Sequence, residues 1–109
     1  MKTSIRIVLF FVLSVSLTQA GEIYGVIKEG ERPVSQGVKV EILIGEKHYS
    51  TETDDYGSYS IYVAEKGECT LMVHYKDQSP SITAYSYEDS VRYNLVLEKR
   101  NGEYHLRRD

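Results

Sequence analysis

The sequence predicts an all-β protein, a seven- to eight-stranded antiparallel Greek-key sandwich, and three observations support this fold class. Apolar and polar residues alternate with period two through most of the chain after residue 20, as in strands that bury one face. No window shows the i, i+3, i+4 apolar spacing of a helix. Turn-forming residues recur at roughly 8–12-residue spacing, which is typical of sandwiches. We therefore expect two sheets that close over one apolar core.

The individual strands are placed by the turn residues between them. The polar segment 48–53 is expected at a sheet edge, where polar side chains discourage edge-to-edge association. Asn101-Gly102 is a strong hairpin signal, because a type I′ turn needs positive φ at both positions. The expected strands are 23–27, 38–44, 48–53, 58–64, 68–76, 82–87, 91–97 and a short final strand at 103–107.

Residues 1–20 have the layout of a secretory signal peptide. Lys2 and Arg6 precede the apolar run IVLFFVLSVSL, and small residues follow it. That run is shorter than the roughly 20 residues needed to span a bilayer. We expect cleavage after Ala20, a secreted or periplasmic protein without a membrane span, and a single domain at 21–109.

Charge and cysteine content exclude several classes of protein. The chain has 13 Lys and Arg against 16 Asp and Glu, and loss of Lys2 and Arg6 gives a net charge of 13 − 2 − 16 = −5. An acidic domain lacks the basic stripe that phosphate contacts require, so no nucleic-acid partner is expected. Cys69 is the only cysteine, so an internal disulfide cannot form. Its inward strand position predicts a buried, inert thiol rather than a nucleophile.

The acidic stretch 53–59, Thr-Asp-Asp-Tyr-Gly-Ser-Tyr, is interpreted as a corner between two strands. Asp54 can accept hydrogen bonds from backbone N–H groups, Gly57 supplies a left-handed conformation, and Tyr59 returns to the core. A calcium site needs six to eight oxygen ligands, more than Asp54, Asp55 and nearby carbonyls provide. We therefore predict a structural turn at Asp54, Gly57 and Tyr59, with no metal and no cofactor.

Four segments in order carry a resemblance to a known family: I-Y-G-V-I, P-V-S-Q-G-V-K-V-E-I, T-D-D-Y-G-S-Y-S-I and G-E-C-T-L-M-V-H-Y. Together they resemble carboxypeptidase regulatory-like domains, which belong to the transthyretin (prealbumin)-like group of sandwiches. The resemblance covers about residues 21–98. It implies a prealbumin-like sandwich in which the T-D-x-x-G-x-Y corner is structural. It also implies a role in folding, packing or contact, as in larger proteins that carry such domains.

The same group contains an enzyme branch, the hydroxyisourate hydrolases, whose chains end in a Tyr-Arg-Gly-Ser-type tail. This chain ends EYHLRRD instead. A zinc site needs three or four converging ligands, and His48, His74 and His105 stand in three separate segments, so we interpret them as isolated surface histidines and predict no catalytic residues and no zinc site. A non-enzymatic binding or structural accessory module is expected, with a small transthyretin-like hydrolase as a lesser alternative.

Tyrosine is the one compositional oddity, with ten residues in the chain. Tyr59, Tyr75 and Tyr93 are assigned to the core. Other tyrosines could serve protein or sugar contacts, or could reflect the high β-propensity of this residue. A carbohydrate-binding module is therefore an alternative function, and the partner is expected to be another extracytoplasmic protein or a glycan. The candidate contact surface is Tyr49, Tyr62, Tyr85 and Tyr87.

Overall fold

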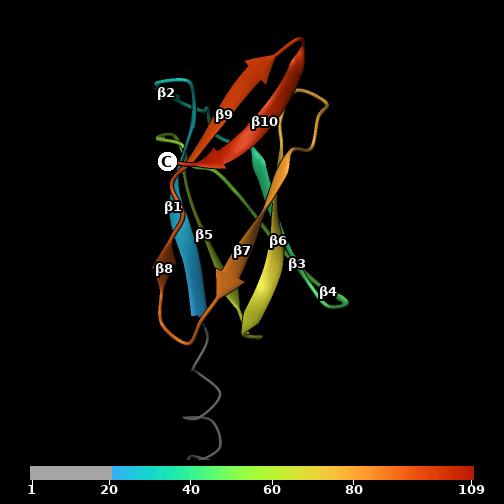
Figure 1. Ribbon diagram of the computed structural model, residues 1–109. Helices are drawn as coiled ribbons and strands as arrows, with labels where there is room; N and C mark the ends of the chain where they lie inside the picture. Colours follow the sequence, from blue (N-terminus) through green and yellow to red (C-terminus); the bar gives the residue numbers. More distant parts are fainter. Residues whose placement is uncertain (1–20) are drawn as a thin grey trace, which may run out of the picture.

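The computed structural model describes residues 21–109, which form two β-sheets and no helix (Figure 1). The prediction of an all-β chain in two layers is confirmed. The predicted signal peptide lies outside the described residues. No helix long and apolar enough to cross a membrane is found within 21–109. The strands are β1 (Gly21–Glu29), β2 (Arg32–Pro33), β3 (Lys39–Ile44), β4 (Lys47–Glu52), β5 (Ser58–Val63), β6 (Gly67–His74), β7 (Ser81–Ser86), β8 (Val91–Arg92), β9 (Leu95–Arg100) and β10 (Glu103–Arg108).

β1 is the centre of the first sheet. Its first half pairs antiparallel with β5 and parallel with β8, and its second half pairs antiparallel with β2 and parallel with β9. β10 completes this sheet by pairing with β9. The parallel pairs depart from the antiparallel sandwich that we predicted. They arise because β7 ends beside the start of β1, where a Cβ on Gly21 would lie 1.9 Å from Tyr87 O, so the chain re-enters the first sheet in the direction of β1 (Figure 1).

The strand predicted at 91–97 is divided into β8 and β9 by a break at Tyr93-Asn94. The Asn94 side chain takes over part of the ladder there, since its Oδ1 accepts a hydrogen bond from Val26 N at 3.0 Å. Tyr93 N donates to Tyr24 O at 2.7 Å. The break approaches β1 so closely that a Cβ on Gly25 would lie 2.2 Å from Tyr93 O. Only glycine fits at this position of β1.

The second sheet has the order β4-β3-β6-β7 and is antiparallel throughout. β4 is an edge strand, which confirms the edge position expected for the polar segment 48–53. The alternation of β3 is regular, with Val40, Ile42 and Ile44 buried and Lys39 and Glu41 on the other face. This is the period-two pattern of a strand that covers a core on one side only.

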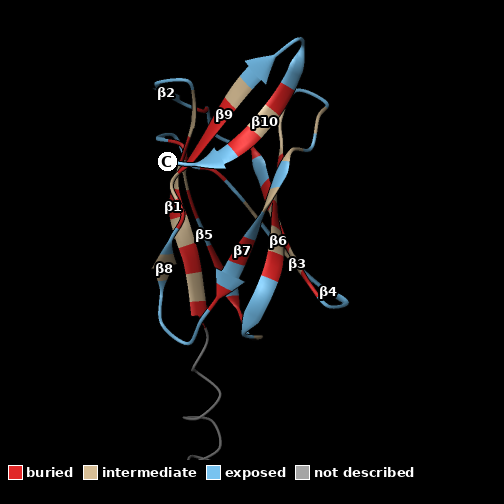
Figure 2. Cartoon of the chain, in the orientation of Figure 1, coloured by how far each residue is buried: buried red, intermediate tan, exposed pale blue. Residues whose placement is uncertain are grey.

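The core lies between the two sheets and takes alternate residues from each (Figure 2). Cys69 is part of it, 4% exposed, and burial raises the pKa of its thiol. The prediction that Cys69 is buried is confirmed. The largest fully buried apolar side chains are Ile23, Ile27, Ile42, Leu71, Leu95, Leu97, Val40, Val63 and Val73.

Candidate functional site

The four tyrosines of the candidate contact surface do not gather on one face. Tyr62 is 63% exposed on β5, and Tyr85 is 44% exposed on β7, so these two rings lie on the outer sides of different sheets. Tyr87 is exposed just beyond β7. Tyr49 is half-buried on β4, packs against the core and donates its hydroxyl proton to Glu65. A coplanar aromatic platform, which stacking on a sugar would require, is not formed by this set.

The corner at 53–59 is held by its own backbone hydrogen bonds, such as Asp54 N to Ser58 O at 3.0 Å, and by one carboxylate oxygen. Asp54 Oδ1 accepts hydrogen bonds from Tyr56 N and Ser58 N, both at 2.9 Å. Gly57 has φ of 76°, and a Cβ on it would lie 2.8 Å from Ile27 O. The Asp54 side chain is thus engaged by backbone donors of its own turn.

Thr53 is a residue of this corner that the sequence did not single out. It is 2% exposed, its Oγ1 donates to Ser35 O at 2.7 Å, and the same atom accepts from Val38 N at 2.9 Å. Thr53 therefore joins the corner to the loop before β3. No group of three or more His, Cys, Asp or Glu residues is placed to hold a metal ion within residues 21–109.

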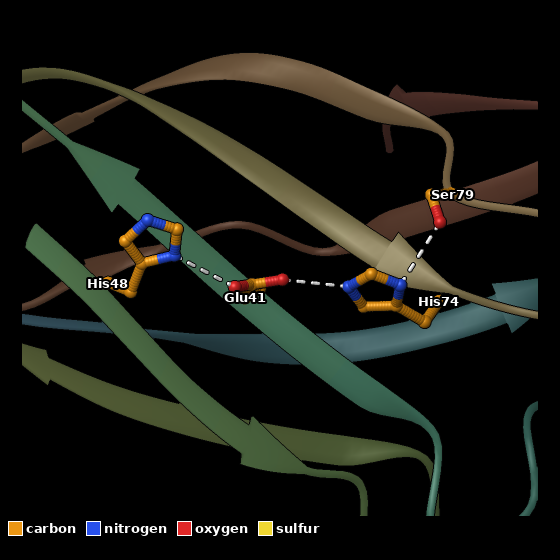
Figure 3. Close-up of polar contacts among 4 residues, drawn as sticks. All are labelled: Glu41, His48, His74 and Ser79. Atoms are coloured by element: carbon orange, nitrogen blue, oxygen red, sulfur yellow. Dashed lines mark hydrogen bonds and ion pairs between the residues drawn. The ribbon is translucent and has the colours of Figure 1, made fainter. Parts of the chain in front are cut away.

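A line of polar contacts crosses the outer face of the second sheet (Figure 3). Glu41 on β3 lies between two histidines: Oε1 is 2.8 Å from His74 Nε2, and Oε2 is 3.1 Å from His48 Nδ1. His74 Nδ1 is in turn 3.0 Å from Ser79 Oγ. The contact to His74 is the largest cause of the lowered pKa of Glu41, and the contact to His48 is the second. We call these four residues the Glu41 array.

The order Ser79, His74, Glu41 has the connectivity of a nucleophile, a base and an orienting carboxylate. Hydrolysis by such a group also needs N–H donors for the oxyanion, often from the backbone next to the nucleophile. Pro80 follows Ser79 and has no N–H. The carboxylate also ties three strands together, since Glu41, His48 and His74 come from β3, β4 and β6. We interpret the Glu41 array as a cross-strand clamp.

At one end of the sandwich the inward-facing positions become polar. Glu29 follows Ile27 along the inner side of β1, and its carboxylate accepts from Tyr75 Oη at 2.6 Å and from Tyr104 Oη at 3.0 Å. Lys76 Nζ lies 3.7 Å from Glu29 Oε1. We call Glu29, Tyr75, Lys76 and Tyr104 the Glu29 cluster.

Every member of the Glu29 cluster contacts at least one other member. The rings of Tyr75 and Tyr104 pack edge to face, with centroids 5.1 Å apart. The Tyr75 hydroxyl is the largest cause that lowers the pKa of Glu29, followed by the Tyr104 hydroxyl, with a smaller part from Lys76. Burial is the main cause that raises the pKa of Tyr75. The cluster thus holds an ionised carboxylate at the open end of the core.

The turn beside this cluster has an unusual backbone. Lys76 and Asp77 have φ of 48° and 65°, and the hydrogen bonds between Tyr75 and Gln78 close a two-residue hairpin around them. Such turns favour Asn-Gly, because ordinary side chains are strained at positive φ. Gln78 fastens the turn to the β9–β10 hairpin, since its Oε1 accepts from Tyr104 N at 2.7 Å and its Nε2 donates to Gly102 O at 2.9 Å. A strained backbone of this kind is often found at functional sites.

A cleft of about 930 Å³ opens beside the Glu29 cluster, between the β1–β2 hairpin and β9. β2 and β9 lie in the upper half of Figure 1. Three cations line it: Arg32, Lys99 and Arg100. None of them forms an ion pair with a carboxylate of residues 21–109, whereas Glu29 is bonded within its cluster and Glu98 is 2.8 Å from Arg107 Nε. The cleft lining therefore has three cations without an ion-pair partner among the described residues, one of which, Lys99, lies over the Tyr104 ring with Nζ 5.7 Å from its centroid, on a domain whose net charge is negative.

No protein-family model matches this sequence, and no curated protein is significantly similar to it. A functional site in this protein is therefore argued from the arrangement of its residues alone. Sequence reasoning missed the Glu29 cluster, although a carboxylate at the inward position after Ile23 and Ile27 was a usable signal. It missed the Glu41 array because that array depends on strand register: Glu41 is opposite Ser50 and Met72, so both histidines are diagonal neighbours.

Proposed function

We propose that residues 21–109 form a non-enzymatic, extracytoplasmic binding module whose partner docks in the cleft between the β1–β2 hairpin and β9. The observation that carries this proposal is the cleft itself, in which unpaired cations adjoin the hydrogen-bonded Glu29 cluster and apolar side chains such as Pro33 and Leu97. Concave sites with a few convergent polar groups are the usual place for ligand contact. The signal-peptide layout of residues 1–20 supports the extracytoplasmic part.

The strand order supports the likeness to carboxypeptidase regulatory-like, prealbumin-like sandwiches. Each sheet contributes four strands of six or more residues, β10-β9-β1-β5 facing β4-β3-β6-β7. The T-D-x-x-G-x-Y corner is held by backbone bonds to Asp54, as a structural corner would be. An accessory role in contact or packing agrees with the functions of such domains.

The non-enzymatic part is supported by the surroundings of the Glu41 array. Ser79 and its histidine lie on the outer face of the second sheet, and Pro80 removes the adjacent oxyanion donor. We expect wild type and Ser79→Ala to hydrolyse 4-nitrophenyl acetate at the same rate, equal to that of a matched concentration of free imidazole. A clear loss of rate in Ser79→Ala would show a catalytic serine and overturn this part of the proposal.

Docking at the cleft is tested by comparative capture. The mature protein, the double variant Lys99→Glu/Arg100→Glu and the control Lys47→Glu are immobilised and exposed to envelope and secreted fractions of the cells that make the protein. Lys47 is an exposed cation at the start of β4, away from the cleft. A partner retained by wild type and by Lys47→Glu but lost from the double variant supports the proposal. Equal retention by all three proteins would overturn it.

A further inference from the structure

The edge of β9 is open where it borders the cleft. β1 pairs with β9 only as far as the Glu29–Leu97 pair, and Gly30 N donates to Leu97 O at 3.2 Å. The chain then turns into β2, whereas β9 continues to Arg100. Beyond Leu97, no strand of residues 21–109 pairs with β9 on the β1 side, and the cleft lies where a longer β1 would run.

The main chain of Lys99 faces this open position. Hydrogen-bonded and non-hydrogen-bonded pairs alternate along an antiparallel ladder. Lys99 is opposite Tyr104, whose N–H donates to Gln78 Oε1 instead. The N–H and C=O of Lys99 therefore point away from β10, beyond the last β1–β9 pair at Leu97, and neither forms a backbone hydrogen bond outside the strand ladders within residues 21–109. One donor and one acceptor are thus available for an added strand.

The side chains around this edge favour a negatively charged ligand. Arg32, Lys99 and Arg100 are exposed and form no ion pair within the described part of the chain, while both carboxylates of the cleft are already bonded. Carboxylates are the complementary groups for a main-chain edge flanked by cations. Pro33, Val34 and Leu97 add apolar groups to the lining. A ligand with alternating acidic and apolar side chains fits both parts.

We propose that the cleft binds an extended, carboxylate-bearing peptide segment of a partner protein, which pairs with β9 at Lys99. This inference rests on the proposed function, because it names the chemistry of the partner at the same cleft. The peptide continues the line of β1 beyond Gly30, next to the end of β9. Its backbone bonds Lys99, and its acidic side chains meet Arg32 and Lys99, which share the face of Glu29, while Arg100 lies on the opposite face of β9.

The probe is the fluorescein-labelled peptide acetyl-Glu-Val-Glu-Val-Glu-Val-amide, measured by anisotropy at low salt. We expect Lys99→Glu and Arg32→Glu to bind it about tenfold or more weakly than wild type, and Lys47→Glu to bind it as wild type does. The matched Gln-Val peptide and a Glu-Val peptide N-methylated at alternate amides should also bind about tenfold or more weakly. Circular dichroism and melting temperatures verify that the variants are folded.

Three outcomes overturn the inference. Equal binding of the Gln-Val peptide removes the role of the carboxylates, and equal binding of the N-methylated peptide removes the strand pairing. Displacement of the probe by an equal concentration of inorganic phosphate indicates a simple anion site. The proposed function is tested separately, by the capture experiment: equal retention by wild type, Lys99→Glu/Arg100→Glu and Lys47→Glu overturns docking at the cleft, whatever the peptide does.

Discussion

The hydroxyl of Tyr75 lies 2.6 Å from Oε1 of Glu29, so a residue at the end of one sheet is bonded to a residue at the end of the other. This contact closes the core at the open end of the sandwich. Tyr75→Phe removes only the hydroxyl and leaves the ring packed against Tyr104. We expect the free energy of unfolding in urea to fall by about 1 kcal/mol, less than is usual for a bond to a charged group, because Glu29 is partly exposed.

The control for this prediction is Tyr62→Phe, which removes a hydroxyl from an exposed ring and should leave the unfolding free energy unchanged. The carboxyl pKa of Glu29, followed by NMR, should rise in Tyr75→Phe, because the largest cause of its lowering is lost. An unchanged Glu29 pKa would show that the hydroxyl does not stabilise the charged form.

Stability should depend on pH through four carboxylates whose pKa values are lowered in the folded state. The first cause is a hydrogen bond in each case: from Tyr75 to Glu29, His74 to Glu41, Tyr49 to Glu65 and Arg107 to Glu98. A group whose folded pKa is lowered stabilises the fold above its unfolded pKa, and this stabilisation is lost as the pH falls through the folded value. The ordinary value is 4.5. We therefore expect the unfolding free energy to decline below about pH 4.5.

Glu41→Gln tests the contribution of the Glu41 array to this decline. The amide cannot ionise, so the variant should lose less stability between pH 5 and pH 3 than wild type does. Glu46→Gln is the control, because Glu46 is exposed in the β3–β4 turn and forms no ion pair within residues 21–109. Identical pH dependence of wild type and Glu41→Gln would contradict the prediction.

The features that the sequence predicted are local ones. The alternation at Val40, Ile42 and Ile44 determines which face of β3 is buried whatever strand lies beside it. The Glu41 array depends on which residues of β4 and β6 lie opposite β3, and this register is set by pairing between distant segments. The parallel β1–β9 pairing likewise depends on where β7 ends relative to β1. Alternation within a strand carries no information on either point.

Cys69 should react slowly with thiol reagents in the native protein. Its side chain is buried, and burial raises its pKa, so little thiolate is present and little of the sulfur is accessible. Labelling by 5,5′-dithiobis(2-nitrobenzoate) should be slow at pH 8 and become rapid in denaturing urea. Rapid labelling under native conditions would show that the sulfur is accessible and that this part of the core opens readily.

Asp77→Gly should stabilise the protein. Asp77 has φ of 65°, where glycine is favoured over residues with a Cβ, so the substitution relieves strain in the turn after Tyr75. Relief of this strain should raise the unfolding free energy by about 0.5–1 kcal/mol. The greater conformational entropy of the unfolded glycine variant should offset part of this gain. Asp55→Gly is the control, since Asp55 does not have positive φ and its replacement should bring no gain. A loss of stability in Asp77→Gly would mean that the Asp77 side chain stabilises the turn.

Alanine substitutions at Gly57 and Gly102 distinguish two costs of adding a Cβ: backbone strain at positive φ, and steric clash with neighbouring atoms. Both glycines have positive φ, 76° and 82°, but a Cβ on Gly57 would lie 2.8 Å from Ile27 O, whereas one on Gly102 meets nothing within 4 Å. Gly102→Ala should therefore cost only the conformational term, about 1 kcal/mol. Gly57→Ala should cost about 2 kcal/mol or more, because the corner must also move away from β1. Equal losses in the two variants would show that the corner can shift freely, and that its close packing on β1 does not hold Asp54 and Thr53 in place.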